Sequence, residues 1–257
     1  MKIVIAIDSF KGSLTSMEAG QAAARGIRRA VPEAEIVVRP LADGGEGTVT
    51  SLVEGMGGEY QTVTVTGPLG EPVESRYGII RETLTGVVEM SSAAGLTLVP
   101  EEKRNPLFAT TYGVGEMIKD AIGKGCRRFI VGIGGSATND GGAGMLQALG
   151  FGLLDQEENP IPFGAEGLKS LHRIDDSTVL PQLKECQFLV ACDVTNPLCG
   201  ERGCSASSKS SDGNPILLRQ LCRSHRGFSH GSLAVQPSFS GKKQIGVFYV
   251  RFQACFS

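Results

Sequence analysis

The chain has 257 residues, of which 41% are hydrophobic and 20% are charged, with a formal net charge of −2. This composition places it among soluble globular proteins with enough residues for one large or two ordinary domains. No apolar run is long enough to span a bilayer, so we expect no membrane partner. The N-terminal apolar stretch is too short and wrongly flanked for a secretory signal peptide, and the seven cysteines include no CxxC pair, which favours reduced thiols. We therefore expect a cytoplasmic protein.

The first predicted elements are a strand and a helix. Residues 2–7 form a short, largely β-branched run that predicts a buried strand. Thr15 and Glu18 have the spacing of a capping box, with Thr15 as N-cap. Apolar residues then recur at helical spacing until Pro32, which predicts a helix that ends before this proline.

A second strand and helix are expected directly afterwards. The strand covers residues 35–39, and Asp43 with Glu46 repeats the capping-box spacing before an apolar helical face. Gly57 and Gly58 end this helix. The β-α-β-α order predicts an α/β fold with a doubly wound, mostly parallel sheet.

The pattern changes over residues 59–99. Three strand patterns, at 61–66, 73–80 and 85–90, follow one another without an intervening helix, which predicts a smaller β-rich inserted subdomain. The α/β rhythm then returns, with a helix from Gly113, a strand over 128–133, a helix over about 141–149 and a strand over 187–192. We therefore expect a discontinuous α/β domain of residues 1–58 plus 100–205, a subdomain of residues 59–99 and an atypical tail of residues 206–257.

Between the 128–133 strand and the next helix lies GIGGSATNDGGAG, residues 132–144, in which six of thirteen residues are glycine. Glycines let the backbone approach a ligand closely, and a helix N-terminus after a strand favours anions. Ser136 and Thr138 add hydroxyl donors, and Asp140 could hold Mg²⁺ or accept a proton. The loop is neither a Walker A nor a Rossmann motif, and the plain alternative is a tight turn with Asp140 as N-cap. The predicted anion-binding residues of the loop are Gly134, Gly135, Ser136, Ala137, Thr138, Asn139, Asp140, Gly141 and Gly142.

Polar groups also gather at the ends of other predicted strands. They are Asp8 and Lys11 after the first strand, Asp43, Gly44, Gly45 and Glu46 after the second, Glu89 and Ser91 at the end of the 85–90 strand, and Asp193 after the last. Each has an ordinary local explanation as a cap, a solvated charge or a turn former. Together, carboxylates, a lysine and an anion loop that converge on one crevice fit phosphoryl transfer, in which the protein positions reactants and neutralises charge.

These residues closely resemble the type-1 glycerate kinase family. The resemblance covers residues 1 to about 204 and rests on MKIVIAIDSFKGSL, LADGGEGT, VTGPLGEPV, VEMSSAAGL, IVGIGGSATNDGGAGMLQALG and VACDVTNPL. Members are two-domain α/β proteins that phosphorylate D-glycerate with ATP and Mg²⁺, giving 2-phosphoglycerate or 3-phosphoglycerate. The resemblance implies the substrate and the reaction. For such a kinase we expect catalytic roles for Asp193, Asp8 and Lys11, with Lys11 offsetting negative charge and Asp193 or Asp140 as base or Mg²⁺ ligand.

The chain departs from this family in two places. Ile7 stands where the family usually has proline, which relaxes the turn into Asp8. From about Ala206 the family motifs stop, and residues 206–257 carry ten serines and a net charge of +6, so we expect a disordered or non-native tail that arose by frameshift or truncation. The aromatic residues of the tail lack stacking-motif spacing, and no nucleic-acid partner is expected.

Two alternatives to an active kinase follow from the same residues. The first is a truncated or frameshifted, inactive kinase fragment that at most binds ligand, and whose exposed apolar faces would favour a homo-oligomer. The second is a phosphosugar-binding regulatory module that uses the same helix-terminus physics.

Overall fold

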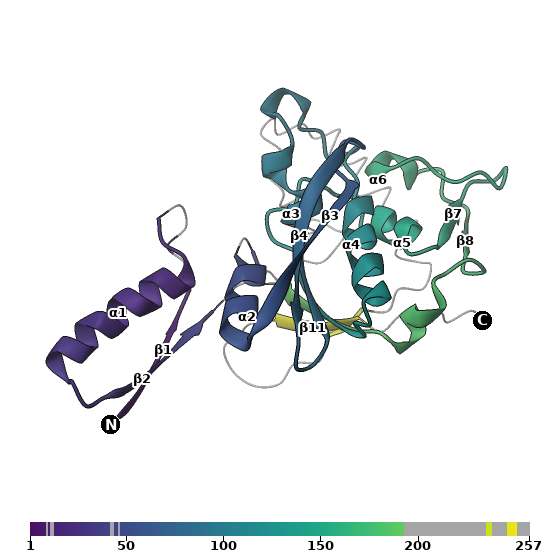
Figure 1. Cartoon of the computed structure of the whole chain (residues 1–257). Helices are drawn as coiled ribbons and strands as arrows, with labels where there is room; N and C mark the ends of the chain where they lie inside the picture. Colours follow the sequence, from purple (N-terminus) through teal and green to yellow (C-terminus); the bar gives the residue numbers. More distant parts are fainter. Residues whose placement is uncertain are drawn as a thin grey trace.

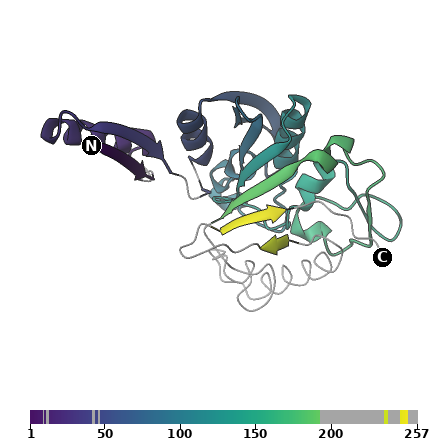
Figure 2. The same cartoon turned by 90° about the horizontal axis from the view of Figure 1, so that it is seen from below.

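A computed structural model describes residues 1–8, 10, 13–41, 44–45, 47–192, 235–237 and 246–250. Within these residues the strands form a two-stranded sheet near the N-terminus, a seven-stranded central sheet and a second two-stranded sheet. Figure 1 shows the N-terminal strands and helix projecting from the body that holds the central sheet, and Figure 2 shows the same separation from below. The α/β fold class is confirmed.

The N-terminal unit consists of β1 (Lys2–Ile7), α1 (Ser16–Ala30) and β2 (Glu35–Pro40). The two strands pair in parallel, and α1 packs so closely on them that a Cβ atom at Gly20 would lie 2.4 Å from Cγ1 of Val38. The predicted capping box is confirmed, because Thr15 Oγ1 accepts from the Glu18 N–H and the Glu18 carboxylate accepts from the Thr15 N–H. In the described part of the chain β1 and β2 pair only with each other, so they form a separate sheet.

The central sheet has the order β10-β11-β9-β6-β5-β4-β3. Its strands are β3 (Gly58–Thr66), β4 (Pro72–Ile80), β5 (Thr85–Glu89), β6 (Arg128–Gly132), β9 (Gln187–Cys192), β10 (Val235–Pro237) and β11 (Gly246–Val250). The centre, β5-β6-β9, is parallel as predicted, whereas the outer pairs are antiparallel. The strands of residues 59–99 continue this sheet through the β5–β6 pairing, and the division of the chain into domains stays a prediction.

Helices cover both faces of the central sheet, as expected for a doubly wound arrangement. Val87 of β5 packs with Val49 and Val53 of α2 (Thr48–Met56) on one face. The next residue, Val88, belongs to the larger core on the other face, to which α4 (Tyr112–Gly123) contributes Met117 and Ile118. The remaining elements are α3 (Ser91–Ala94), η1 (Leu96–Leu98), η2 (Glu101–Lys103), α5 (Ala143–Ala148), β7 (Gly152–Leu154), α6 (Gly164–Gly167), β8 (Arg173–Asp175) and η3 (Pro181–Glu185).

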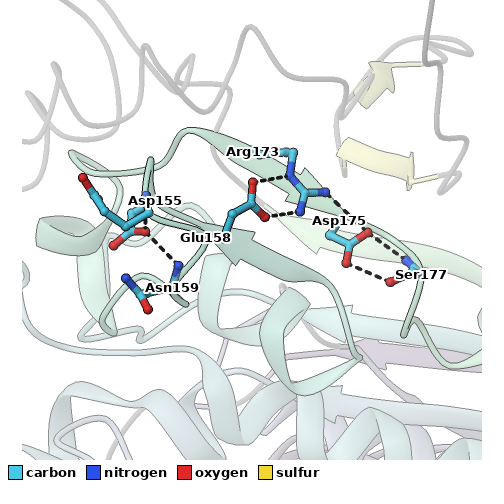
Figure 3. A network of polar contacts seen from close by, with 7 residues as sticks. Asp155, Glu158, Asn159, Arg173, Asp175 and Ser177 are labelled. Atoms are coloured by element: carbon cyan, nitrogen blue, oxygen red, sulfur yellow. Dashed lines mark hydrogen bonds and ion pairs between the residues drawn. The ribbon is translucent and has the colours of Figure 1, made fainter.

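Polar contacts surround the small antiparallel sheet of β7 and β8, as Figure 3 shows. The Arg173 guanidinium pairs with Glu158, and its Nε lies 3.2 Å from Glu158 Oε1. This guanidinium lowers the pKa of the Glu158 carboxyl below its usual range. Asp155 Oδ1 accepts from the Asn159 N–H at 2.8 Å and closes the turn that follows β7. These contacts are exposed, so they contribute little to stability and mainly fix the turn.

A polar cluster joins the end of α4 to the central sheet. The Tyr77 hydroxyl of β4 donates to Asp120 Oδ2 at 2.6 Å, and Lys124 Nζ donates to the same oxygen at 2.7 Å. Burial raises the pKa of Asp120, but the hydrogen bonds from Lys124 and Tyr77 outweigh it and bring the pKa below its usual value. The ionised Asp120 therefore stabilises the folded state.

Acidification is expected to remove the contribution of Asp120 to stability. Because its pKa is lower in the folded protein than in the unfolded chain, its contribution is fully present above the ordinary aspartate pKa of about 4 and is lost as the pH falls through the folded value. Asp120→Asn should therefore lower the free energy of unfolding near pH 7, and the difference from wild type should shrink towards pH 3. Urea unfolding followed by circular dichroism measures both values. Glu102→Gln on the exposed η2 is the control, and a difference for Asp120→Asn that is equal at both pH values would contradict the argument.

None of the helices in the described part of the chain combines the length and the apolar character that a membrane span requires. Of the tail predicted to be disordered or non-native, the structure describes only residues 235–237 and 246–250, whose backbones add β10 and β11 to the sheet.

Candidate active site

The carboxyl ends of the three parallel strands meet at one edge of the central sheet. Glu89 at the end of β5 is in register with Gly132 at the end of β6, and Gly132 is in register with Ala191 near the end of β9. This is the edge at which open α/β sheets bind ligands. The predicted convergence of the Glu89, glycine-loop and β9 ends is therefore present in the backbone.

The Gly44–Gly45 segment lies directly on this edge. The Gly134 N–H donates to the Gly44 carbonyl at 3.0 Å, which joins the segment to the start of the glycine loop. A Cβ atom at Gly44 would lie 2.4 Å from the Ala191 carbonyl oxygen, and Gly44 has a φ of +89°. Only glycine combines this close approach with this backbone conformation. The predicted proximity of the second strand's loop to the anion loop is thus present at Gly44 and Gly45.

The other side of the glycine loop is bonded to the segment after β5. The Leu96 N–H donates to the Gly135 carbonyl at 2.9 Å, and the Ala137 N–H donates to the Ala94 carbonyl at 2.8 Å. Ser91 packs against the loop, since a Cβ atom at Gly135 would lie 3.3 Å from its Cβ. The loop is therefore held between two backbone segments, one on each side.

The tip of the loop presents polar groups. The hydroxyls of Ser136 and Thr138 are 2.6 Å apart, and Ser136 Oγ accepts from the Thr138 N–H at 3.0 Å. The backbone N–H groups of Gly135 and Ser136 make no hydrogen bond within the described part of the chain, and Gly135 is exposed. Successive N–H groups in a turn can form an anion-binding concavity. The loop can therefore offer two N–H groups and one hydroxyl hydrogen to an anion, because the bond between Ser136 and Thr138 uses the other hydroxyl hydrogen.

Asp140 is buried rather than directed at this tip. It is 1% exposed, and its Oδ2 accepts from the Thr111 N–H at 2.9 Å, from Thr111 Oγ1 at 2.8 Å and from the Gly144 N–H at 3.1 Å. Its Oδ1 accepts from the Gly142 N–H at 3.0 Å. The alternative of Asp140 as a helix cap fits these contacts, although the N-cap residue itself is Gly142. A carboxylate whose two oxygens are occupied by protein donors does not fit a Mg²⁺ ligand.

Glu89 is also engaged by the protein. Its Oε1 accepts from the N–H of Val49, the second residue of α2, at 2.6 Å. The capping box predicted at Asp43 and Glu46 is wrong, because α2 begins at Thr48 with Gly47 as N-cap. The carboxylate that caps this helix comes instead from β5, forty residues along the chain, so local spacing could not reveal it.

Of the remaining predicted site residues, the structure describes Asp8 only. Asp8 follows β1, beside the point where the Leu41 N–H donates to the Ile7 carbonyl at 2.9 Å, so it lies at the carboxyl end of the N-terminal sheet. The other predicted residues lie outside the described residues; they are Lys11, Asp43, Glu46 and Asp193. Among the described residues, no three of His, Cys, Asp or Glu gather as they would around a metal ion.

Two features of the site were not predicted from the sequence. One is the role of residues 94–96 as the second support of the loop, for which the sequence held no signal because the pairing is backbone to backbone. The other is Thr111, which binds Asp140. A threonine close to the start of a predicted helix is an N-cap signal, and it could have drawn attention to this position.

Comparison with known proteins identifies the family. A family model described as the glycerate kinase family matches residues 3–209. The chain belongs to the glycerate kinase family. The predicted resemblance is thereby confirmed for most of the chain.

Individual relatives agree with this assignment. A glycerate kinase of Haemophilus influenzae is 51% identical over 222 residues, which are 86% of this chain and 59% of the relative. A glycerate 2-kinase of Escherichia coli K12 is 52% identical over 205 residues, 80% of this chain and 54% of the relative. A crystal structure described as glycerate kinase 2 from Salmonella typhimurium LT2 superposes with a TM-score of 0.85 at 46% identity, over 90% of this chain and 62% of that chain. The chain thus spans somewhat more than half the length of these glycerate kinases.

Proposed function

We propose that this protein is an ATP-dependent glycerate kinase that transfers the γ-phosphoryl group to a hydroxyl of D-glycerate, giving 2-phosphoglycerate or 3-phosphoglycerate. The observation that carries the proposal is the glycine loop, held at the carboxyl edge of a parallel sheet in a chain of the glycerate kinase family. Relatives that are about half identical to this chain carry the name glycerate kinase. The free thiols of Cys126 and Cys186 support a reducing, cytoplasmic location.

The loop residues suit the charge of this reaction. Both reactants are anionic, so the N–H groups of Gly135 and Ser136 can bind the glycerate carboxylate or a phosphate of ATP, together with whichever hydroxyl of Ser136 and Thr138 does not donate to the other. The Gly44–Gly45 segment contacts the start of the loop at Gly134. This contact keeps the donors in place before the ligand binds. Such pre-organised donors are the main catalytic device in phosphoryl transfer.

The transfer itself requires a base and charge neutralisation. The hydroxyl oxygen of glycerate forms the new bond to the γ-phosphorus, the bond from this phosphorus to the bridging β-γ oxygen breaks, and ADP leaves. We assign the role of the base that accepts the hydroxyl proton to Asp193. Asp140 does not suit this role, because it is buried and its oxygens already accept hydrogen bonds from the protein. Lys11 and Asp8 keep their predicted catalytic roles. Because the oxygens of Asp140 are occupied by protein donors, we assign the predicted Mg²⁺ ligand to Asp193, which lies outside the described residues.

An ADP-release assay on the purified full chain, with ATP, MgCl₂ and D-glycerate, tests the proposal. We expect ADP formation that depends on D-glycerate, and ³¹P NMR of the product distinguishes 2-phosphoglycerate from 3-phosphoglycerate. Reactions without glycerate and with L-glycerate are the controls. A folded sample, verified by circular dichroism, that binds ATP but forms no ADP would overturn the proposal in favour of the inactive fragment.

A further inference from the structure

Asp140 joins the first turns of two helices behind the glycine loop. Its carboxylate accepts from the Gly142 and Gly144 N–H groups at the start of α5, and from the N–H and hydroxyl of Thr111, the N-cap of α4. The Thr111 hydroxyl in turn accepts from the Met145 N–H at 3.0 Å. One buried carboxylate and one buried hydroxyl thus connect α4, α5 and the end of the loop.

Hydrogen-bond donors and helix N-termini compensate the charge of Asp140. Four donors surround its two oxygens, and it lies at the start of both α4 and α5, where the positive ends of the helix dipoles favour an anion. The packing around it is dense, because a Cβ atom at Gly144 would lie 2.2 Å from Thr110 Oγ1 and 3.1 Å from Asp140 Oδ2. A ligand has no room beside this carboxylate, so any effect on the site must pass through the backbone.

We propose that Asp140 and Thr111 form a positioning pair that fixes the backbone of the glycine loop and thereby the direction of its anion-binding groups. The expected effect of the pair on catalysis rests on the proposed function, whereas its expected effect on the loop backbone does not. Gly141 and Gly142 have φ values of +63° and +84°, and without an anchor such glycines would sample other conformations. Asp140 lies in the same loop, only a few residues after Gly135 and Ser136. A shift of the backbone at Asp140 therefore moves the N–H groups of these two residues, which are proposed to bind the anion.

The hydrogen-bond pattern predicts how substitutions act. Asp140→Asn can keep the oxygen that faces Thr111 and Gly144, but it places an NH₂ group against the Gly142 N–H and removes the charge. Thr111→Val removes both hydroxyl bonds while keeping the shape, whereas Thr111→Ser keeps them. Tyr77→Phe is the matched control, because it also removes a buried hydroxyl bond but acts at the far end of α4.

Two measurements test the pair: hydrogen exchange over residues 139–145, and the KM and kcat for D-glycerate in the ADP-release assay. For Asp140→Asn and Thr111→Val we expect exchange faster by about tenfold and KM raised by about tenfold or more, with kcat changed by less than about threefold, since misplaced binding groups weaken binding. Thr111→Ser and Tyr77→Phe should match the wild type over residues 139–145 and in KM.

Each other outcome has a defined meaning. Unchanged exchange and KM in Asp140→Asn would overturn the proposal, as would a collapse of kcat at constant KM, which would indicate direct participation in the chemistry. If Asp140→Asn does not fold, Thr111→Val decides by the same criteria, with Thr111→Ser as its rescue. If the wild-type chain has no turnover, the proposed function fails, and the exchange rates alone decide whether the pair holds the loop.

Discussion

Gly134→Ala is expected to lower kcat/KM for D-glycerate by about a hundredfold or more, because it displaces the glycine loop from the Gly44–Gly45 segment. A Cβ atom at Gly134 would lie 2.7 Å from the Cα of Gly45 and 3.2 Å from the Gly44 oxygen. Both are backbone atoms, so neither can move without shifting its segment. Displacements of about 1 Å in a catalytic site can cost about a hundredfold in rate.

The matched control is Gly26→Ala in α1, where a new Cβ atom meets nothing within 4 Å. This substitution should leave kcat/KM unchanged and raise the free energy of unfolding by about 0.5–1 kcal/mol, because alanine favours a helix interior. Steady-state ADP release measures the first quantity and urea unfolding the second. Wild-type kcat/KM in a folded Gly134→Ala protein would show that the contact with Gly45 does not position the loop.

Phe129→Ala is expected to cause the largest loss of stability, about 3–5 kcal/mol, because it opens a cavity under α4. Phe129 is fully buried in β6, and its ring stacks on Phe188 of β9 at a centroid distance of 4.9 Å. The ring also covers Gly86 of β5, where a Cβ atom would lie 2.9 Å from it. Its removal would leave this glycine and the Phe188 ring without contacts on one side.

Such a loss is a large share of the 5–15 kcal/mol that is typical of folded proteins. Urea unfolding measured by circular dichroism gives the change, since the chain has no tryptophan to report on unfolding. Phe129→Leu keeps most of the volume and should cost less than about 1.5 kcal/mol. Equal losses in the two variants would contradict the cavity argument.

The features that sequence analysis predicted correctly depend on neighbours in the chain. The bounds of β1 and the Thr15–Glu18 capping box are confirmed, because β-branched runs and capping residues act within a few positions. The end of α2 at Gly57 is likewise confirmed, since a left-handed C-cap needs glycine locally. The family resemblance is confirmed over residues 3–209.

The features that sequence analysis missed depend on distant partners. The predicted N-cap position of α2 was wrong, because the helix begins at Thr48 after Gly47, and Glu89 of β5 accepts from its first turn. Asp43 and Glu46 themselves lie outside the described residues. Asp140 was predicted to hold Mg²⁺ or accept a proton because it lies just before a helix in the glycine loop. Thr111, twenty-nine residues earlier in the chain, instead donates to its carboxylate from its N–H and its hydroxyl. The roles of Asp193, Lys11 and Asp8 stay predictions.

The contact of Gly44 with the end of β9 limits how this protein can diverge. A side chain at position 44 would meet the carbonyl oxygen and carbon of Ala191, which every amino acid carries. No replacement at position 191 can therefore make room for a larger residue at position 44. A substitution of Gly44 cannot be compensated by exchanging the side chain of residue 191. A compensating change must alter the path of the main chain, through an insertion or deletion beside one of the two segments.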